Sequence, residues 1–169
     1  MRGSLVGVCC ASLALMAGCG DDENESTPPE VLSGLTRGDF VLRADRICME
    51  GRKRLLLAGN REFGGLPSDV NPSDAEVTEF AKREAIPTLR LQYARLRELE
   101  PPPGDERQIA RILDQAERGI DQLQADPTIL NRGSGIPPGL QQAQQGAFEY
   151  GLGACGQPIE RQTKSPAAP

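Results

Sequence analysis

Histidine and tryptophan are both absent from this chain of 169 residues, and aromatic residues make up only 4% of it. Without histidine there is no imidazole base, which excludes a Ser-His-Asp triad and a Cys-His pair. A tetrahedral zinc site would need four thiolates or carboxylates, and their spacing offers no such set. The GxSxG, SxxK, Walker and strand-linked GxGxxG motifs are also missing. We therefore expect a protein that is not an enzyme, with no catalytic, cofactor-binding or metal-binding residue.

Basic residues are too few for a nucleic-acid surface, because 24 acidic side chains outnumber 19 basic ones. The net charge of −5 opposes binding to phosphates, so we expect no nucleic-acid partner. Adjacent acidic pairs do not replace the missing imidazole either. Asp21-Asp22 lies in a polar N-terminal segment and Asp105-Glu106 marks a helix start, so neither pair suits an acid/base dyad.

Long hydrophobic runs are lacking too, since the longest one, near the N-terminus, covers roughly 14 residues. A bilayer-spanning helix needs about 20. Arg2 gives this segment a short positive start, Leu5 to Leu15 form its apolar part, and Met16-Ala17-Gly18-Cys19 matches a lipobox. An ordinary secretion signal has small residues at −3 and −1, whereas registers that end near Gly18 place Leu15 or Met16 at −3.

We predict that residues 1–18 are a lipoprotein signal peptide and that Cys19 carries a covalent diacylglyceryl lipid. Plain secretion and an uncleaved anchor are the alternatives. The lipid would hold the mature chain on the extracytoplasmic face of the cell membrane. Residues 19–38 have the composition of a flexible acidic tether, 39–156 are expected to form one folded domain, and 157–169 a disordered tail.

Two of the five cysteines are left for the folded domain. Cys9 and Cys10 would leave with the signal peptide, and Cys19 would be capped by lipid. Cys48 and Cys155 then face an oxidising compartment, and their separation fits no CxxC motif. We predict a structural disulfide that ties the last helix to the first, with two buried free thiols as the alternative.

The folded part shows only helical periodicity, and no alternating run of strand length occurs after the leader. Helices are expected over 39–58, from Ser73 to Pro101, from Asp105 to Asp126, and from Pro137 onwards. The expected cap residues are Thr36, Ser73 with Glu76, and Asp105, and the expected stops are Gly59-Asn60, Pro101 and Asp126-Pro127. The fourth helix is expected to bury Leu140, Ala143, Ala147, Phe148 and Gly151.

These helices predict an all-α fold, an up-and-down bundle of about four helices. Pro87 should kink the second helix or break it, and a kink is favoured because the apolar stripe resumes on a compatible face. The connections 59–72 and 126–137 are long for such a bundle, so we look there for a binding contact. Arg52-Lys53-Arg54 is either the solvated back of the first helix or a basic patch for anionic lipid headgroups.

Three separated blocks carry a resemblance to a known group. They are Ala44-Asp45-Arg46-Ile47-Cys48, the stretch from Pro87 to Pro103, and the stretch from Tyr150 to Gly156. Over about residues 39–156 the chain resembles a group of actinobacterial lipoproteins and secreted helical proteins that has no assigned activity. The resemblance implies export, helices and a cysteine pair, and it implies no catalytic or binding residue.

Two functional classes remain. The first is a non-enzymatic envelope module that binds a protein partner, a wall component or a small apolar ligand. The second is a hydrolase that works through carboxylates alone. A pocket with converging buried carboxylates would favour the enzyme, and an apolar surface without them would favour binding.

Overall fold

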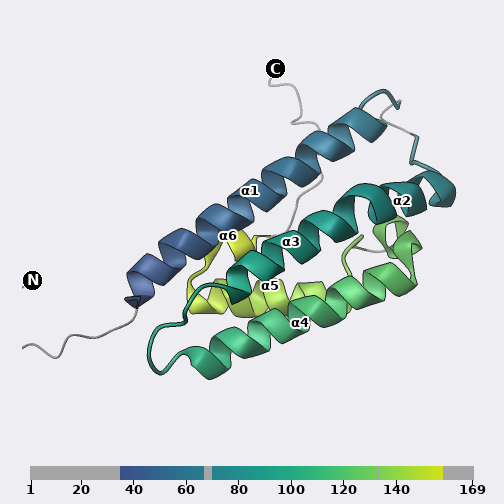
Figure 1. The fold of residues 1–169 in the computed structure, drawn as a ribbon. Helices are drawn as coiled ribbons and strands as arrows, with labels where there is room; N and C mark the ends of the chain where they lie inside the picture. The colour runs from purple at the N-terminus through teal and green to yellow at the C-terminus, as the bar shows by residue number, and fades with distance from the viewer. Residues whose placement is uncertain (1–34, 67–69, 133, 158–169) are drawn as a thin grey trace, which may run out of the picture. The chain divides into compact units, whose positions relative to one another are not determined.

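Helices make up every regular element that the structure, a computed structural model, describes in residues 35–66, 70–132 and 134–157, as predicted (Figure 1). The predicted signal peptide, Cys19 and the predicted tail after Gln157 lie outside the described residues. The elements are α1 (Arg37–Phe63), α2 (Asp74–Phe80), the π-helical turn η1 (Ala81–Ala85), α3 (Ile86–Arg97), α4 (Glu106–Ala125), the 3-10 turn η2 (Pro127–Asn131), α5 (Pro138–Tyr150) and α6 (Gly153–Gly156). None of these helices combines the length and the apolar character needed to cross a bilayer.

Helix α1 begins as predicted but ends later. The Thr36 hydroxyl accepts a hydrogen bond from the Asp39 N–H at 3.2 Å, so the expected cap is present. The predicted stop at Gly59-Asn60 is wrong, because the helix continues to Phe63 and the Gly64 N–H closes it on the Asn60 carbonyl at 2.8 Å. Glycine lowers helix stability without forbidding a helix, and tertiary contacts outweigh that cost here.

The second helical segment runs through α2, η1 and α3 and passes Pro87 without a break. Ser73 and Glu76 form the complete capping box that their spacing predicts. Upstream of Pro87 the backbone widens into a π-helical turn, and a π-bulge is one way to distort a helix at a proline. The wider turn adds a residue to the buried stripe, so Ala85 and Ile86 both face the core.

Helix α4 buries the whole predicted stripe, namely Ile109, Ile112, Leu113, Ala116, Ile120 and Leu123. The predicted side-chain cap by Asp105 is wrong, because its carboxylate accepts a hydrogen bond from the Tyr150 hydroxyl at 2.6 Å. On α5 the prediction for Phe148 is also wrong, since 67% of it is exposed. Tyr150, three residues after Ala147, occupies the buried position and packs edge-on against Phe40.

Ion pairs and caps show that successive long helices are antiparallel. Arg95, near the end of α3, pairs with Glu50 at the middle of α1, and Arg83, which precedes α3, pairs with Glu62 near the end of α1. Helix α5 runs back along α4, because Gln122 near the end of α4 accepts the Gly139 N–H at 3.0 Å. The two helices meet backbone to backbone, and a Cβ added to Gly119 would lie 2.2 Å from the Leu140 nitrogen.

The predicted disulfide between Cys48 and Cys155 is present, with Cα atoms 5.1 Å apart. Cys155 lies on the short helix α6 and not on the helix before it. The Gly151 backbone takes a φ of 103°, which ends α5 and allows this change of direction. Asp45 of α1 accepts the Ala154 N–H at 2.8 Å, so α6 is held to the middle of α1 by two attachments.

Candidate functional site

A cleft of about 640 Å³ lies between the second half of α1 and the rest of the bundle. Its other walls come from α2, η1, α3, the end of α4, η2, the segment 134–137, α5 and α6. The expectation that the two long connections take part in binding fits this position, because Asn71, Pro72, Leu130 and Ile136 are all in its wall.

The cleft follows from the unequal lengths of α1 and α5. Helix α1 has 27 residues and α5 has 13, which correspond to about 40 Å and about 20 Å. Buried side chains from the first half of α1 join α3, α4 and α5 in one core cluster. In the second core cluster, Leu55 is the α1 side chain, and it is only partly buried. Ala58 is buried and Phe63 packs against Phe80, but the rest of the second half of α1 covers this apolar surface only in part.

One face of α1 supplies the longest wall of the cleft. Its lining residues recur at steps of three and four, as one side of a helix requires. They are Cys48, Arg52, Leu55, Leu56, Gly59, Asn60 and Phe63. The opposite wall is mostly aliphatic and aromatic, with Val77, Phe80, Ala85, Leu89, Leu123, Leu130, Ile136, Pro137 and Leu140. A cleft with this chemistry can bind apolar groups by removing them from water.

Polar groups gather at the end of the cleft next to the disulfide. The amides of Gln92, Gln144 and Gln157 line the cleft, and Gln92 donates to the Cys48 sulfur at 3.4 Å. Within the described part of the chain, Arg52 is the charged residue of the lining, and no aspartate or glutamate contributes to it. The described residues also contain no group of three or more acidic or cysteine side chains placed to hold a metal.

Arg52 reaches across from α1 to α6. Its guanidinium donates to the Ala154 carbonyl at 2.7 Å, and to the backbone and side-chain oxygens of Gln157, both at 3.0 Å. Ala154 belongs to α6 and Gln157 is the residue after it, so two of these acceptors are backbone carbonyls at the C-terminal end of α6, where a cation is favoured. The interpretation of the whole Arg52-Lys53-Arg54 run as a solvated helix back is thus wrong for Arg52, whereas Lys53 and Arg54 are exposed.

Tyr93 of α3 lines the cleft and is partly buried. Burial raises the pKa of its hydroxyl to about 12, so the hydroxyl keeps its proton at neutral pH and can donate it. No hydrogen bond joins this hydroxyl to another residue among those described, and it is not sealed from solvent. It is therefore a free donor inside an apolar space.

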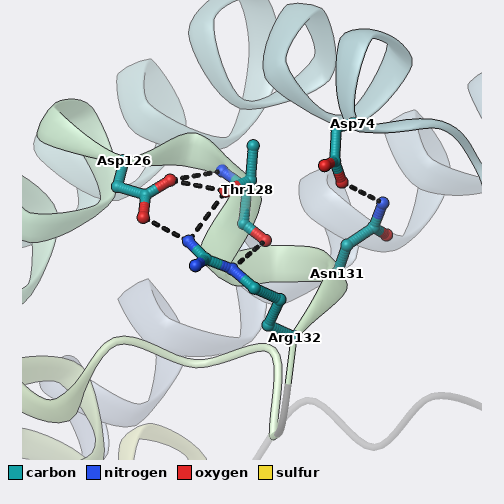
Figure 2. A network of polar contacts seen from close by, with 5 residues as sticks. All are labelled: Asp74, Asp126, Thr128, Asn131 and Arg132. Atoms are coloured by element: carbon teal, nitrogen blue, oxygen red, sulfur yellow. Dashed lines mark hydrogen bonds and ion pairs between the residues drawn. The ribbon is translucent and has the colours of Figure 1, made fainter.

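A polar network fixes the far end of the cleft (Figure 2). Asp126 accepts hydrogen bonds from the Thr128 N–H and hydroxyl at 3.2 and 2.6 Å and pairs with Arg132. The Asn131 amide donates to the Pro72 carbonyl at 2.8 Å and to Asp74 at 3.1 Å. These contacts tie η2 to the start of α2. They hold the wall segment that carries Leu130 in place.

Of the residues singled out from the sequence, Cys48 and Cys155 both lie in the cleft wall. Cys19 lies outside the described residues, so its lipidation stays a prediction. The predicted helix 39–58 contains Cys48, Arg52, Leu55 and Leu56 but leaves out Phe63, the last α1 residue of the lining. The steps from Leu55 and Leu56 to Phe63 were the available signal.

Comparisons with known proteins add nothing to this site. No family model matches the chain, and neither a curated protein nor a solved structure matches it.

Proposed function

We propose that this chain is a non-enzymatic binding module of the bacterial envelope whose cleft holds a small apolar ligand. The cleft itself carries the proposal. Its volume of about 640 Å³ lies within the range of about 300–1,000 Å³ that is usual for small-molecule sites. A largely apolar lining with a limited number of polar side chains is also usual for such sites.

The alternative of a carboxylate-dependent hydrolase has less support. Such an enzyme needs carboxyl groups that converge on the substrate and whose pKa values are pushed apart by their surroundings. The described lining contains neither aspartate nor glutamate. We therefore place the function of the cleft in binding.

Lipid anchoring through Cys19 is the second part of the proposal, and the lipobox pattern Met16-Ala17-Gly18-Cys19 supports it. The anchor would keep the bundle on the extracytoplasmic face of the cell membrane. Mass spectrometry of the mature N-terminal peptide tests this: we expect an acylated Cys19 as the first residue. An unmodified peptide that begins elsewhere, or membrane attachment of a Cys19→Ala variant, would contradict it.

The binding proposal is tested by filling the cleft from α1. Gly59 lies in the lining, and no atom stands within 4 Å of a Cβ added there, so Gly59→Trp inserts bulk without a backbone clash. Leu57→Trp is the matched control, because Leu57 is 57% exposed and outside the lining. Each variant would be made in the chain from Gly20 onwards, which contains every described contact.

We expect a fluorescent apolar probe to bind the parent chain, which starts at Gly20 and so carries no lipid anchor, and the Leu57→Trp variant with equal affinity. The Gly59→Trp variant should lose this binding while it keeps the helical spectrum of the parent. Equal binding by both variants would place the probe outside the cleft. No binding by the parent chain would refute the proposed function.

A further inference from the structure

The position of Arg52 favours a ligand of the apolar cleft that carries a negative charge. This inference rests on the proposed binding function. Arg52 lies on the cleft-facing side of α1, one turn after Cys48 and at the polar end. It is half-buried, whereas the neighbouring Lys53 and Arg54 are exposed. A cation at this position is partly removed from water, which favours an anionic partner.

Among the residues that the structure describes, no carboxylate balances the charge of Arg52. Its three hydrogen bonds all go to neutral oxygens, those of Ala154 and Gln157. No carboxylate in the described part of the chain pairs with it, although six other arginines have such partners. Those six are Arg61, Arg83, Arg90, Arg95, Arg97 and Arg132. The contacts with α6 fix the guanidinium and leave it a full positive charge.

The guanidinium also keeps donors for a ligand. Arginine has five N–H donors in a planar fork, and the bonds to Ala154 and Gln157 use three of them. The remaining donors can bind a carboxylate or phosphate oxygen, groups that arginine prefers. The Tyr93 hydroxyl and the Gln92 amide line the same cleft and can supply further hydrogen bonds to a headgroup.

The apolar part of the cleft matches one extended acyl chain. The lining of α1 continues from Arg52 to Phe63, a rise of about 16 Å at about 1.5 Å per residue. Half of a bilayer's hydrocarbon core, which one acyl chain spans, is about 15 Å thick. Leu55, Leu56 and Phe63 line this path from the charged end to the far end.

We propose that the cleft binds a single-chain amphiphile, with its anionic head on Arg52 and its acyl chain along α1 toward Phe63. The head is a carboxylate or a phosphate, since both fit the guanidinium. An uncharged occupant, such as a neutral ring compound, would make no use of the Arg52 charge.

The test compares three probes of equal chain length on the delipidated chain from Gly20 onwards. The probes are palmitate, 1-palmitoyl lysophosphatidate and the neutral hexadecanol, with binding measured by calorimetry. We expect at least one anion to bind about tenfold or more tightly than hexadecanol, as hydrogen bonds to charged groups allow. The tighter of the two anions identifies the head.

Substitutions distinguish the effect of the Arg52 charge on binding from the role of Arg52 in holding α6 against α1. Arg52→Gln should lose the preference for the anion and keep its affinity for hexadecanol. Arg52→Lys should retain most of the preference, because the charge remains. Lys53→Gln, which removes the exposed neighbouring charge, should leave all three affinities unchanged.

Three results would overturn the inference. One is equal affinity of the parent chain for the anions and hexadecanol, which would leave apolar binding by the cleft intact. Another is that Arg52→Gln weakens the affinity for all three probes equally and also lowers the melting temperature. Arg52 would then only hold α6 against α1. A parent chain that binds none of the probes would refute both this inference and the proposed function.

Discussion

Glycine at a helix contact sets how closely α4 and α5 approach each other. A Cβ added at Gly119 would lie 2.2 Å from the Leu140 nitrogen, a contact that only a backbone shift can relieve. We expect Gly119→Ala to lower the free energy of unfolding by about 1–3 kcal/mol, the usual cost of overpacking. Gly59→Ala is the matched control. It meets no atom within 4 Å and should raise stability by about 0.5–1 kcal/mol through helix propensity.

Denaturant unfolding of the two variants measures this difference. If Gly119→Ala is as stable as the parent chain, the close contact between the helices is not required for packing.

The two tyrosines of the chain predict a loss of stability at alkaline pH. Burial, followed by the hydrogen bond to Asp105 and the charge of Asp105, raises the pKa of Tyr150 to about 12 against the opposing charge of Arg37. Burial alone raises the pKa of Tyr93 to about 12. In the unfolded chain both phenols titrate near about 10. Above that pH the unfolded chain gives up protons that the folded chain keeps, so stability falls as pH rises.

Each tyrosine should cost about 1 kcal/mol of unfolding free energy at about pH 11 relative to pH 9. Unfolding curves at the two pH values measure this loss. Tyr93→Phe and Tyr150→Phe should each remove the part of this stability loss that comes from the substituted tyrosine. An unchanged pH dependence in both variants would mean that the tyrosines titrate normally in the folded chain.

At neutral pH, Tyr150→Phe should also lower the free energy of unfolding by about 1 kcal/mol, because the hydrogen bond to Asp105 is lost.

At the scale of elements, the π-helical turn makes Pro87 compatible with a buried helix. Pro87 is exposed, while Ala81, Ala85 and Ile86 are buried against α4 and α5. Packing of these three side chains therefore holds the wider turn independently of the proline ring. We expect Pro87→Ala to remain folded, with a change in unfolding free energy of less than about 1 kcal/mol.

The circular dichroism spectrum and a denaturant titration of Pro87→Ala check this expectation. A loss of several kcal/mol would show that the proline itself sets the geometry of the segment.

Features that depend on neighbouring residues could be predicted from the sequence. The caps at Thr36 and Ser73 are local, and the stripe of α4 is a regular period along one helix. Features that depend on contacts with other helices could not be predicted from the sequence. Asp105 gives its carboxylate to Tyr150, which is 45 residues away, instead of capping its own helix. Helix α1 continues past Gly59-Asn60, and its last turn packs Phe63 against Phe80 and pairs Glu62 with Arg83, contacts that no local pattern records.

For the whole molecule, the cleft illustrates the same limit. It arises because α5 is shorter than α1 and follows α4 closely, and no local pattern records that relation. Adjacency in the sequence groups Arg52 with Lys53 and Arg54. Its position four residues after Cys48, however, places it on the side of α1 that faces the cleft. The disulfide could be predicted, since compartment and elimination left only Cys48 and Cys155.

That disulfide joins α6 to the middle of α1, and both of its cysteines line the cleft. It spans a sequence separation of 107 residues, for which the loss of unfolded-state entropy corresponds to about 4–5 kcal/mol, with measured values often lower. We expect reduction to lower the free energy of unfolding by about 2–5 kcal/mol. It should also weaken binding of the apolar probe, because α6 loses its covalent hold on α1.

Unfolding curves with and without reductant measure the first effect, and probe titrations measure the second. A Cys48→Ala/Cys155→Ala double variant is the control, because reductant should not change its stability further. Non-reducing peptide mapping should recover a linked peptide that contains both cysteines. If both thiols react with an alkylating agent without prior reduction, and reductant leaves the parent chain's melting temperature unchanged, the bridge does not form in solution. The bundle then depends on its aliphatic core and on the contacts of Asp45 and Arg52 with α6.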